Sequence, residues 1–152
     1  MQKLSAYIEA LAEKIEHAEK INPAVSSSSV GWHVQHSLMV ITAISDQLKK
    51  SDSFEYKYRF NKWRTLVFLM NKIPRGKGKS PSFVNPLQVS SVVDLLAMVE
   101  SSKMMIKELK TFPKHSYFTH PYFGKLHLNS SIQFLNIHTN HHLKIIKDIV
   151  QS

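Results

Sequence analysis

Two histidines near the C-terminal end of the chain, His138 and His142, are four residues apart in a segment of helical periodicity. This spacing places them one turn apart on the same face of a helix. The same face carries Phe134, Ile145 and Ile149, so we expect it to point into the protein interior. Two imidazoles in this arrangement can bind one divalent metal ion, whereas two buried imidazoles without partners are costly.

A third ligand has to come from another helix, and the segment from Trp32 onward offers His33 and His36. Helical periodicity does not choose between them, although the apolar stripe places His33 nearer its centre and His36 nearer its edge. His141 is three residues from His138 and is the alternative to His142. The histidines of two helices together favour a metal site over the other interpretation, hydrogen-bonded core histidines.

Three neutral histidines leave a four-coordinate metal with one open position, the arrangement of catalytic zinc. Such an ion lowers the pKa of bound water or binds a thiol as thiolate. No Asp or Glu lies within four residues of any of these candidate ligands, which disfavours a hydrolase that uses a glutamate base. Neighbouring amide side chains are the candidates for hydrogen bonds to the ligands: Gln35, Gln133, Asn136 and Asn140.

The elements that would position these residues are long helices. Helical periodicity predicts them at residues 3–20, 30–50, 90–110 and 129–150. The run Ser26–Ser29 predicts an N-cap for the second, and Asn129 or Ser130 one for the last. We interpret residues 54–73 as a basic aromatic segment with a helical second half, 74–81 as an irregular loop, and 112–128 as a connecting loop without strands. The prediction is an all-α four-helix bundle, one domain over residues 1–152, with long irregular loops between helices 2–3 and 3–4.

Composition narrows the chemistry further. The chain has no cysteine, so any reactive thiol must arrive on a small molecule. Its net charge is +9, and residues 49–79 contain ten basic residues against Asp52 and Glu55, which suits an anionic partner. The N-terminus lacks the apolar stretch of a signal peptide, and no apolar run is long enough to span a bilayer. We therefore expect a cytoplasmic protein without a membrane partner.

The basic segment also bears on nucleic-acid binding. Tyr56 and Tyr58 lie among its charges, as in proteins that bind single strands. Its later apolar residues, however, follow helical spacing, which predicts that they pack in the core: Phe60, Trp63, Leu66, Val67 and Met70. Nucleic acid is therefore the less favoured partner.

The pattern VGWHVQHSL at residues 30–38, followed by HTNHH at 138–142, resembles the DinB-like superfamily. The stretches PRGK at 74–77 and HPYFGKL at 120–126 resemble one subfamily within it, whose function is not assigned. In that superfamily a tryptophan-x-x-x-histidine in the second helix supplies the first metal ligand, and a histidine-x-x-x-histidine in the last helix supplies the other two. The resemblance therefore implies His36, His138 and His142 as ligands, in preference to His33 and His141.

DinB-like proteins include transferases and isomerases that use low-molecular-weight thiols such as bacillithiol or mycothiol. The resemblance implies a divalent-metal-dependent thiol transferase acting on a small, anionic substrate, with zinc or nickel as the ion. A metal-dependent hydrolase is the first alternative. A basic nucleic-acid-binding bundle and a non-catalytic structural bundle are alternatives from other classes, and the exposed helix faces leave a homodimer open.

Overall fold

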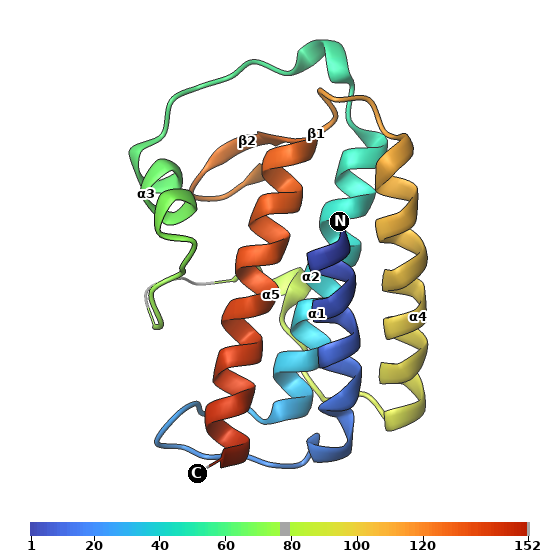
Figure 1. The fold of residues 1–152 in the computed structure, drawn as a ribbon, viewed down its shortest axis with the longest axis vertical. Helices are drawn as coiled ribbons and strands as arrows, with labels where there is room; N and C mark the ends of the chain where they lie inside the picture. The colour runs from blue at the N-terminus through green and yellow to red at the C-terminus, as the bar shows by residue number, and fades with distance from the viewer. Residues whose placement is uncertain (77–79, 152) are drawn as a thin grey trace.

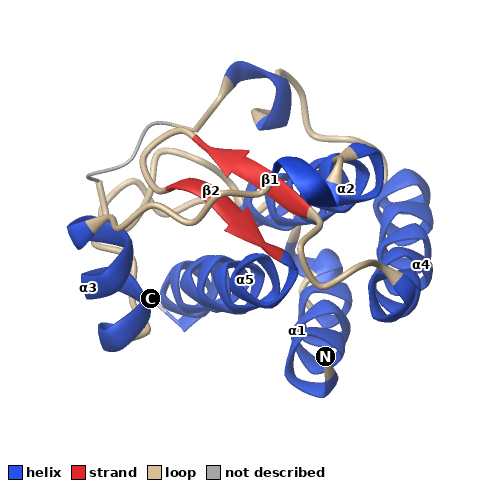
Figure 2. Ribbon diagram, turned by 90° about the horizontal axis from the view of Figure 1, so that it is seen from above, coloured by secondary structure: helices blue, strands red, loops and turns tan. Residues whose placement is uncertain are grey.

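The computed structural model describes residues 1–76 and 80–151, and its architecture is mainly α-helical (Figure 1). Four long helices run side by side: α1 (Gln2–Glu13), α2 (Val30–Lys50), α4 (Val92–Glu108) and α5 (Leu128–Gln151). Both α1 and α2 pack against α4 and α5. A shorter helix, α3 (Lys62–Met70), lies outside this group on the flank of α5 (Figure 2).

The start of α2 is held by a cap and by the chain that precedes it. Ser29 Oγ accepts a hydrogen bond from the Trp32 backbone N–H, which confirms the predicted serine cap. The first helix is shorter than predicted: α1 ends at Glu13 and a 3₁₀ turn, Ile15–His17, follows. Beyond that turn the carbonyls of Ala18 and Lys20 accept hydrogen bonds from the first two amides of α2, so the chain has already left the axis of α1.

The core lies between the four long helices. Each contributes apolar residues at helical spacing, and burying one such side chain fully stabilises the fold by about 1.5–3 kcal/mol. Representative fully buried side chains are Leu4, Ile8, Leu38, Ile41, Leu95, Leu109, Leu135 and Ile146. No helix in the described part of the chain combines the length and the apolar character needed to cross a bilayer.

The prediction of a strand-free loop at 112–128 is wrong. The segment forms an antiparallel hairpin of β1 (Tyr117–His120) and β2 (Gly124–His127), so the fold is mainly rather than purely α-helical. Phe118 and Leu126 are paired across the hairpin, and both are buried against the helices. The strands have only four residues each, too few for an alternating pattern to be distinguished from a loop.

The turn of this hairpin depends on two residues. His120 Nδ1 accepts hydrogen bonds from the backbone amides of Tyr122 and Phe123, at 3.1 and 3.2 Å. Gly124 has φ +72°, a conformation that glycine adopts without steric cost. The hairpin leads directly into α5, and His127, rather than the predicted Asn129 or Ser130, accepts the hydrogen bond of the Ser130 amide there.

The connection between α2 and α4 is not wholly irregular, because it contains α3 and two 3₁₀ turns, Ser53–Glu55 and Ser82–Val84. The predicted loop at 74–81 lies partly outside the described residues, at 77–79. Arg64 attaches α3 to its surroundings: the guanidinium donates to the carbonyls of Arg59 and Phe123 at 2.7 and 3.5 Å. It also lies 4.9 Å from the centre of the Tyr58 ring.

The prediction that the apolar residues of this segment pack in the core holds for Val67, which is half-buried against the core, and is wrong for the other four. Phe60 is 71% exposed and Trp63 is 60% exposed, while Leu66 and Met70 are 45% and 59% exposed. The inner side of α3 is occupied instead by Arg64, by the half-buried Val67, and by Phe68, whose ring lies 6.2 Å from that of Phe123.

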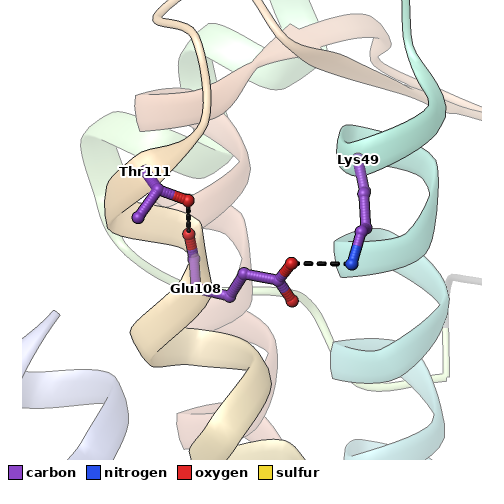
Figure 3. Close-up of polar contacts among 3 residues, drawn as sticks. All are labelled: Lys49, Glu108 and Thr111. Atoms are coloured by element: carbon purple, nitrogen blue, oxygen red, sulfur yellow. Dashed lines mark hydrogen bonds and ion pairs between the residues drawn. The ribbon is translucent and has the colours of Figure 1, made fainter.

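At the opposite end of the helices from the start of α2, a surface contact joins α2 to α4 (Figure 3). Lys49 Nζ lies 2.6 Å from Glu108 Oε1, and Thr111 Oγ1 donates to the Glu108 carbonyl at 2.8 Å. Both charged side chains are well exposed, so the ion pair contributes little to stability.

Candidate metal centre

Three histidines from two neighbouring helices meet inside the protein. His36 comes from α2, and His138 and His142 come from α5. One ring nitrogen of each lies within 4.8 Å of the corresponding atoms of the other two. The side chains are 2%, 9% and 7% exposed respectively. The structure therefore brings the three predicted ligands together in a buried group that could bind a metal.

The spacing of the group fits a metal ion. Nitrogens at 2.0–2.1 Å from a tetrahedral ion lie about 3.3 Å from each other. His36 Nε2 and His138 Nε2 are 3.3 Å apart. The ring centres of His36 and His138 lie 4.7 and 4.6 Å from that of His142, so the third imidazole faces the same space.

The orientation of His36 is set by the chain before α4. His36 Nδ1 lies 2.7 Å from the Val84 carbonyl oxygen. Since a carbonyl only accepts, Nδ1 carries the proton and the lone pair of Nε2 points toward His138. The Trp32 ring stacks on His36 with centres 4.9 Å apart, and its Nε1 donates to the Pro86 carbonyl at 3.2 Å. The segment 84–86 thus holds both rings in place.

The orientation of His142 is set by a second pair of contacts. Its Nδ1 lies 3.0 Å from His33 Nδ1, and His33 Nε2 lies 3.0 Å from Ser26 Oγ. We assign the protons from this network: His142 Nδ1 donates to His33 Nδ1, and His33 Nε2 donates to the serine hydroxyl. The lone pair of His142 Nε2 can then bind a metal ion. His33, the alternative third ligand by periodicity, lies behind His142 instead and is 4% exposed.

His138 is the member of the group whose hydrogen bonding is incomplete. Its buried Nδ1 has no hydrogen-bond partner among the described residues. If Nδ1 carries the proton, the Nε2 lone pair faces that of His36; if Nε2 carries it, the Nδ1 lone pair is buried without a donor. Either tautomer is unfavourable in a group of neutral rings. A cation between the two Nε2 atoms removes the repulsion of the first tautomer.

Burial keeps these imidazoles uncharged. It lowers the pKa of His36, and it lowers the pKa values of His138 and His142 well below the ordinary 6.5, with neighbouring histidines adding to the effect. Burial, followed by the charge of a protonated His36, lowers the pKa of His33 to about 4. All four rings are therefore neutral at pH 7, and neutral imidazole is the form that binds metal.

His141, the alternative to His142, is outside the group. It is half-buried, and its ring meets that of His142 edge-on with centres 5.2 Å apart. It lines a cavity of about 580 Å³ between α5 and residues 70–75, where Lys72, Arg75 and Lys144 supply basic groups. Burial lowers the pKa of His141 to about 4, so it adds no charge at neutral pH.

In the described part of the chain, none of the four amides predicted to hold the ligands has a hydrogen bond to His36, His138 or His142. Gln133 lines a separate cavity between α3 and α5. Gln35 exchanges two hydrogen bonds of 2.9 Å with Ser90, at the start of the chain leading into α4. Asn136 donates to the Ile132 carbonyl of its own helix, and Asn140 lines the basic cavity. Among the described residues, the groups that hold His36 and His142 are instead a carbonyl and His33. A backbone carbonyl carries no sequence signal, and Ser26 was recognised only as part of a capping run.

Gly31 lets the start of α2 approach its neighbours closely. A Cβ at this position would lie 2.7 Å from Val89 Cγ1 and 3.1 Å from both Cβ and the carbonyl oxygen of Ala18. These distances are shorter than ordinary van der Waals contact. The glycine thus permits the packing that positions Trp32 and His33 immediately after it.

We compared the chain with models of known protein families, with curated proteins and with solved structures, and found no match in any of the three. The DinB-like resemblance therefore stays a prediction.

Proposed function

We propose that the chain is a four-helix bundle of DinB-like type whose three histidines hold one divalent ion, zinc or nickel, for a transfer reaction with a small thiol. The observation that carries the proposal is the convergence of three neutral imidazoles at metal-ligand spacing, with the outer nitrogens of two of them held by hydrogen bonds. Such positioned outer nitrogens are typical of metal-binding histidines.

The surroundings of the group favour thiol chemistry over the activation of water. When bound, a divalent ion supplies an open position that stabilises a thiolate. Among the described residues, the only charged groups that shift the pKa values of His138 and His142 in either direction are other histidines, so no carboxylate lies close enough to these two ligands to serve as a base. A thiol that binds the ion as thiolate has already lost its proton, so its attack needs no carboxylate base. Because the chain has no cysteine, the thiol belongs to a small molecule.

The basic cavity beside His141 supports an anionic substrate. Its volume of about 580 Å³ lies in the range of small-molecule sites. Arg75 is held there by Asp148 at 2.7 Å, and Lys72 and Lys144 add positive charge. A carboxylate or phosphate bound among these groups would lie next to His141, on the side of α5 adjoining the histidine group.

Elemental analysis tests the metal site directly. The untagged parent, prepared without a nickel column, should contain about one first-row metal per chain, and His138→Ala should lose it. His141→Ala is the matched control, because it removes a neighbouring imidazole outside the group, and it should retain the metal. A parent without metal after incubation with zinc or nickel, or loss in both variants alike, would refute the assignment of the ligands.

A second assay tests the reaction. The metal-loaded protein is incubated with a low-molecular-weight thiol and an aryl halide, so that a carbon–sulfur bond forms, the carbon–halogen bond breaks, and halide and a proton are released to the buffer. We expect turnover in the parent and in no preparation of His138→Ala. A metal-loaded parent that gives no turnover above that of His138→Ala would leave the metal site standing and refute the proposed reaction.

A further inference from the structure

The outward side of α3 is apolar, although a helix on the surface of a protein normally presents polar residues there. We use the term outer face of α3 for Trp63, Leu66, Leu69 and Met70, which are 60%, 45%, 83% and 59% exposed. The inner side is already occupied by Arg64, which is 7% exposed. The helix is attached through this inner side, and the four apolar side chains of the outer face remain largely exposed, although Leu69 and Met70 also border cavities next to α5.

Exposed basic residues lie close in the sequence to this outer face, and one of them, Lys72, also lines the cavity beside His141. Residues 56–76 contain six basic side chains and no acidic one. Arg64 is buried and Arg75 pairs with Asp148. The other four are exposed and lie before, within and after α3: Lys57, Arg59, Lys62 and Lys72. An exposed apolar surface with a positive rim is the combination that binds the interface of an anionic bilayer.

We propose that the outer face of α3 docks on the surface of an anionic lipid bilayer. Helix α3 lies in the plane of the interface, its apolar side chains enter the boundary of the acyl chains, and the surrounding lysines and arginine contact the headgroups. The proposal does not depend on the metal site. It departs from the expectation of no membrane partner, which rested on the lack of a long apolar run, because surface docking requires no such run.

Two features of the segment support this arrangement. The nine residues of α3 span about 13 Å, and the helix is held on the protein by the guanidinium of Arg64, whose bonds to two backbone carbonyls leave the outer face unobstructed. Phe60, two residues before the helix, is 71% exposed and enlarges the apolar surface. Trp63 is a residue type enriched at membrane interfaces.

Charge and shape disfavour the other occupants. In a symmetric dimer whose two outer faces of α3 meet, the basic residues around both faces would be brought together. Residues 56–76 contain no acidic side chain that could balance this charge. A single-stranded nucleic acid needs aromatic platforms for its bases. Trp63 and the neighbouring Phe60 are aromatic, but the remaining exposed surface, from Leu66, Leu69 and Met70, is aliphatic and suits hydrocarbon better than bases.

Flotation with lipid vesicles tests the proposal. The full chain is mixed with vesicles of phosphatidylcholine alone, or with about 30% phosphatidylserine, at low and at physiological salt. We expect binding to the anionic vesicles that weakens with salt. Leu66→Ser/Leu69→Ser should weaken it about tenfold, because two partly inserted leucines are lost. Lys57→Gln/Lys62→Gln should weaken it about fivefold for each charge removed.

Matched variants on α4 and on the 3₁₀ turn that follows it, Leu109–Thr111, control for general surface effects. Val93→Ser/Leu96→Ser removes apolar side chains that are 75% and 47% exposed, close to the values for Leu69 and Leu66. Lys107→Gln/Lys110→Gln removes two exposed charges. Neither should change vesicle binding. In a Trp32→Phe background, the fluorescence of Trp63 should shift to the blue on binding and be quenched by lipids brominated on their acyl chains.

Four outcomes would overturn the proposal. A folded parent that does not float with anionic vesicles, or α4 variants that bind as weakly as the α3 variants, would show that this face does not insert. Binding of an oligonucleotide that depends on Lys57 and Lys62 but not on Leu66 and Leu69, without vesicle binding, would assign the face to single strands. A dimer dispersed by Leu66→Ser/Leu69→Ser would assign it to a second copy of the chain.

Discussion

The contact between His33 and His142 gives the sharpest prediction for the candidate metal centre. The two Nδ1 atoms are 3.0 Å apart, and His33 is itself held by Ser26 at 3.0 Å. If His142 is a ligand through Nε2, His33 is the group that fixes its tautomer. Replacing His33 by leucine leaves the imidazole of His142 in place and removes the acceptor of its buried N–H.

Loss of such a supporting contact typically weakens metal binding 10–100-fold, which corresponds to about 1.4–2.7 kcal/mol. We expect His33→Leu to show this loss while retaining one metal per chain at saturation. His33→Asn should keep most of the affinity, because the amide oxygen lies near the position of Nδ1 and can accept from His142. The zinc affinity is measured at pH 7.5 by competition with a chromogenic chelator, with circular dichroism to verify the fold.

Each alternative role of His33 gives a different result. If His33 is itself a ligand, His33→Leu abolishes stoichiometric binding as His138→Ala does. If His33 only fills space, His33→Leu binds zinc as tightly as the parent does. His33→Asn, which leaves a small void, then binds zinc more weakly than His33→Leu. Either result would refute the assignment of His33 as the residue that orients His142.

Three further predictions concern stability. Gly31→Ala places Cβ 2.7 Å from Val89 Cγ1 and 3.1 Å from the Ala18 carbonyl oxygen. The overpacking, about 1–3 kcal/mol, should outweigh the gain in helix propensity, about 1 kcal/mol, so the free energy of unfolding measured in urea should fall. Adding Val89→Ala should restore part of the lost stability. Burial lowers the pKa of His120 to about 4, so the unfolded chain takes up this proton before the folded protein does, and stability is lost as the pH falls from about 6.5 toward 4. His120→Asn, which keeps an acceptor for the turn amides, should reduce that loss by about 2–3 kcal/mol. An unchanged pH dependence of the free energy of unfolding would contradict this role of His120. Arg64→Met removes the donors to two backbone carbonyls, so hydrogen exchange of the α3 amides should accelerate while exchange in the middle of α2 stays slow. Uniform acceleration would show that α3 is not a separate unit.

The parts of the fold that were predicted correctly from the sequence are those encoded locally. The bounds of α2 agree with the predicted 30–50 because its helical periodicity and its serine cap belong to consecutive residues. The choice between His33 and His36 is different. Both are buried, at 4% and 2% exposed, since α2 is covered on most of its circumference, and only the position of α5 decides which of them faces His138.

The errors have a common cause in tertiary structure. Helical spacing of Trp63, Leu66 and Met70 indicated a helix correctly, but the assumption that its apolar side faces the core was wrong. A buried arginine took the inner position, because two backbone carbonyls were there to accept its hydrogen bonds. The hairpin was missed since its stability depends on the packing of Phe118 and Leu126 against the helices, which no run of four residues reveals.

Removal of the metal distinguishes a functional site from a structural one. The three histidines come from α2 and α5 alone, and both helices are also joined to α1 and α4 by the apolar core. The fold therefore does not need the metal for its connectivity, unlike small domains that are unfolded without zinc.

With free metal at 100 times its Kd, binding stabilises the folded state by about 2.7 kcal/mol. For a chain of this size that raises the Tm by about 5–11 °C. We expect chelation to lower the Tm of the parent by this amount with no change in helical circular dichroism, and to leave the Tm of His138→Ala unchanged. Unfolding of the parent on chelation would show that the metal is structural, and an unchanged Tm would show that the histidine group binds no metal.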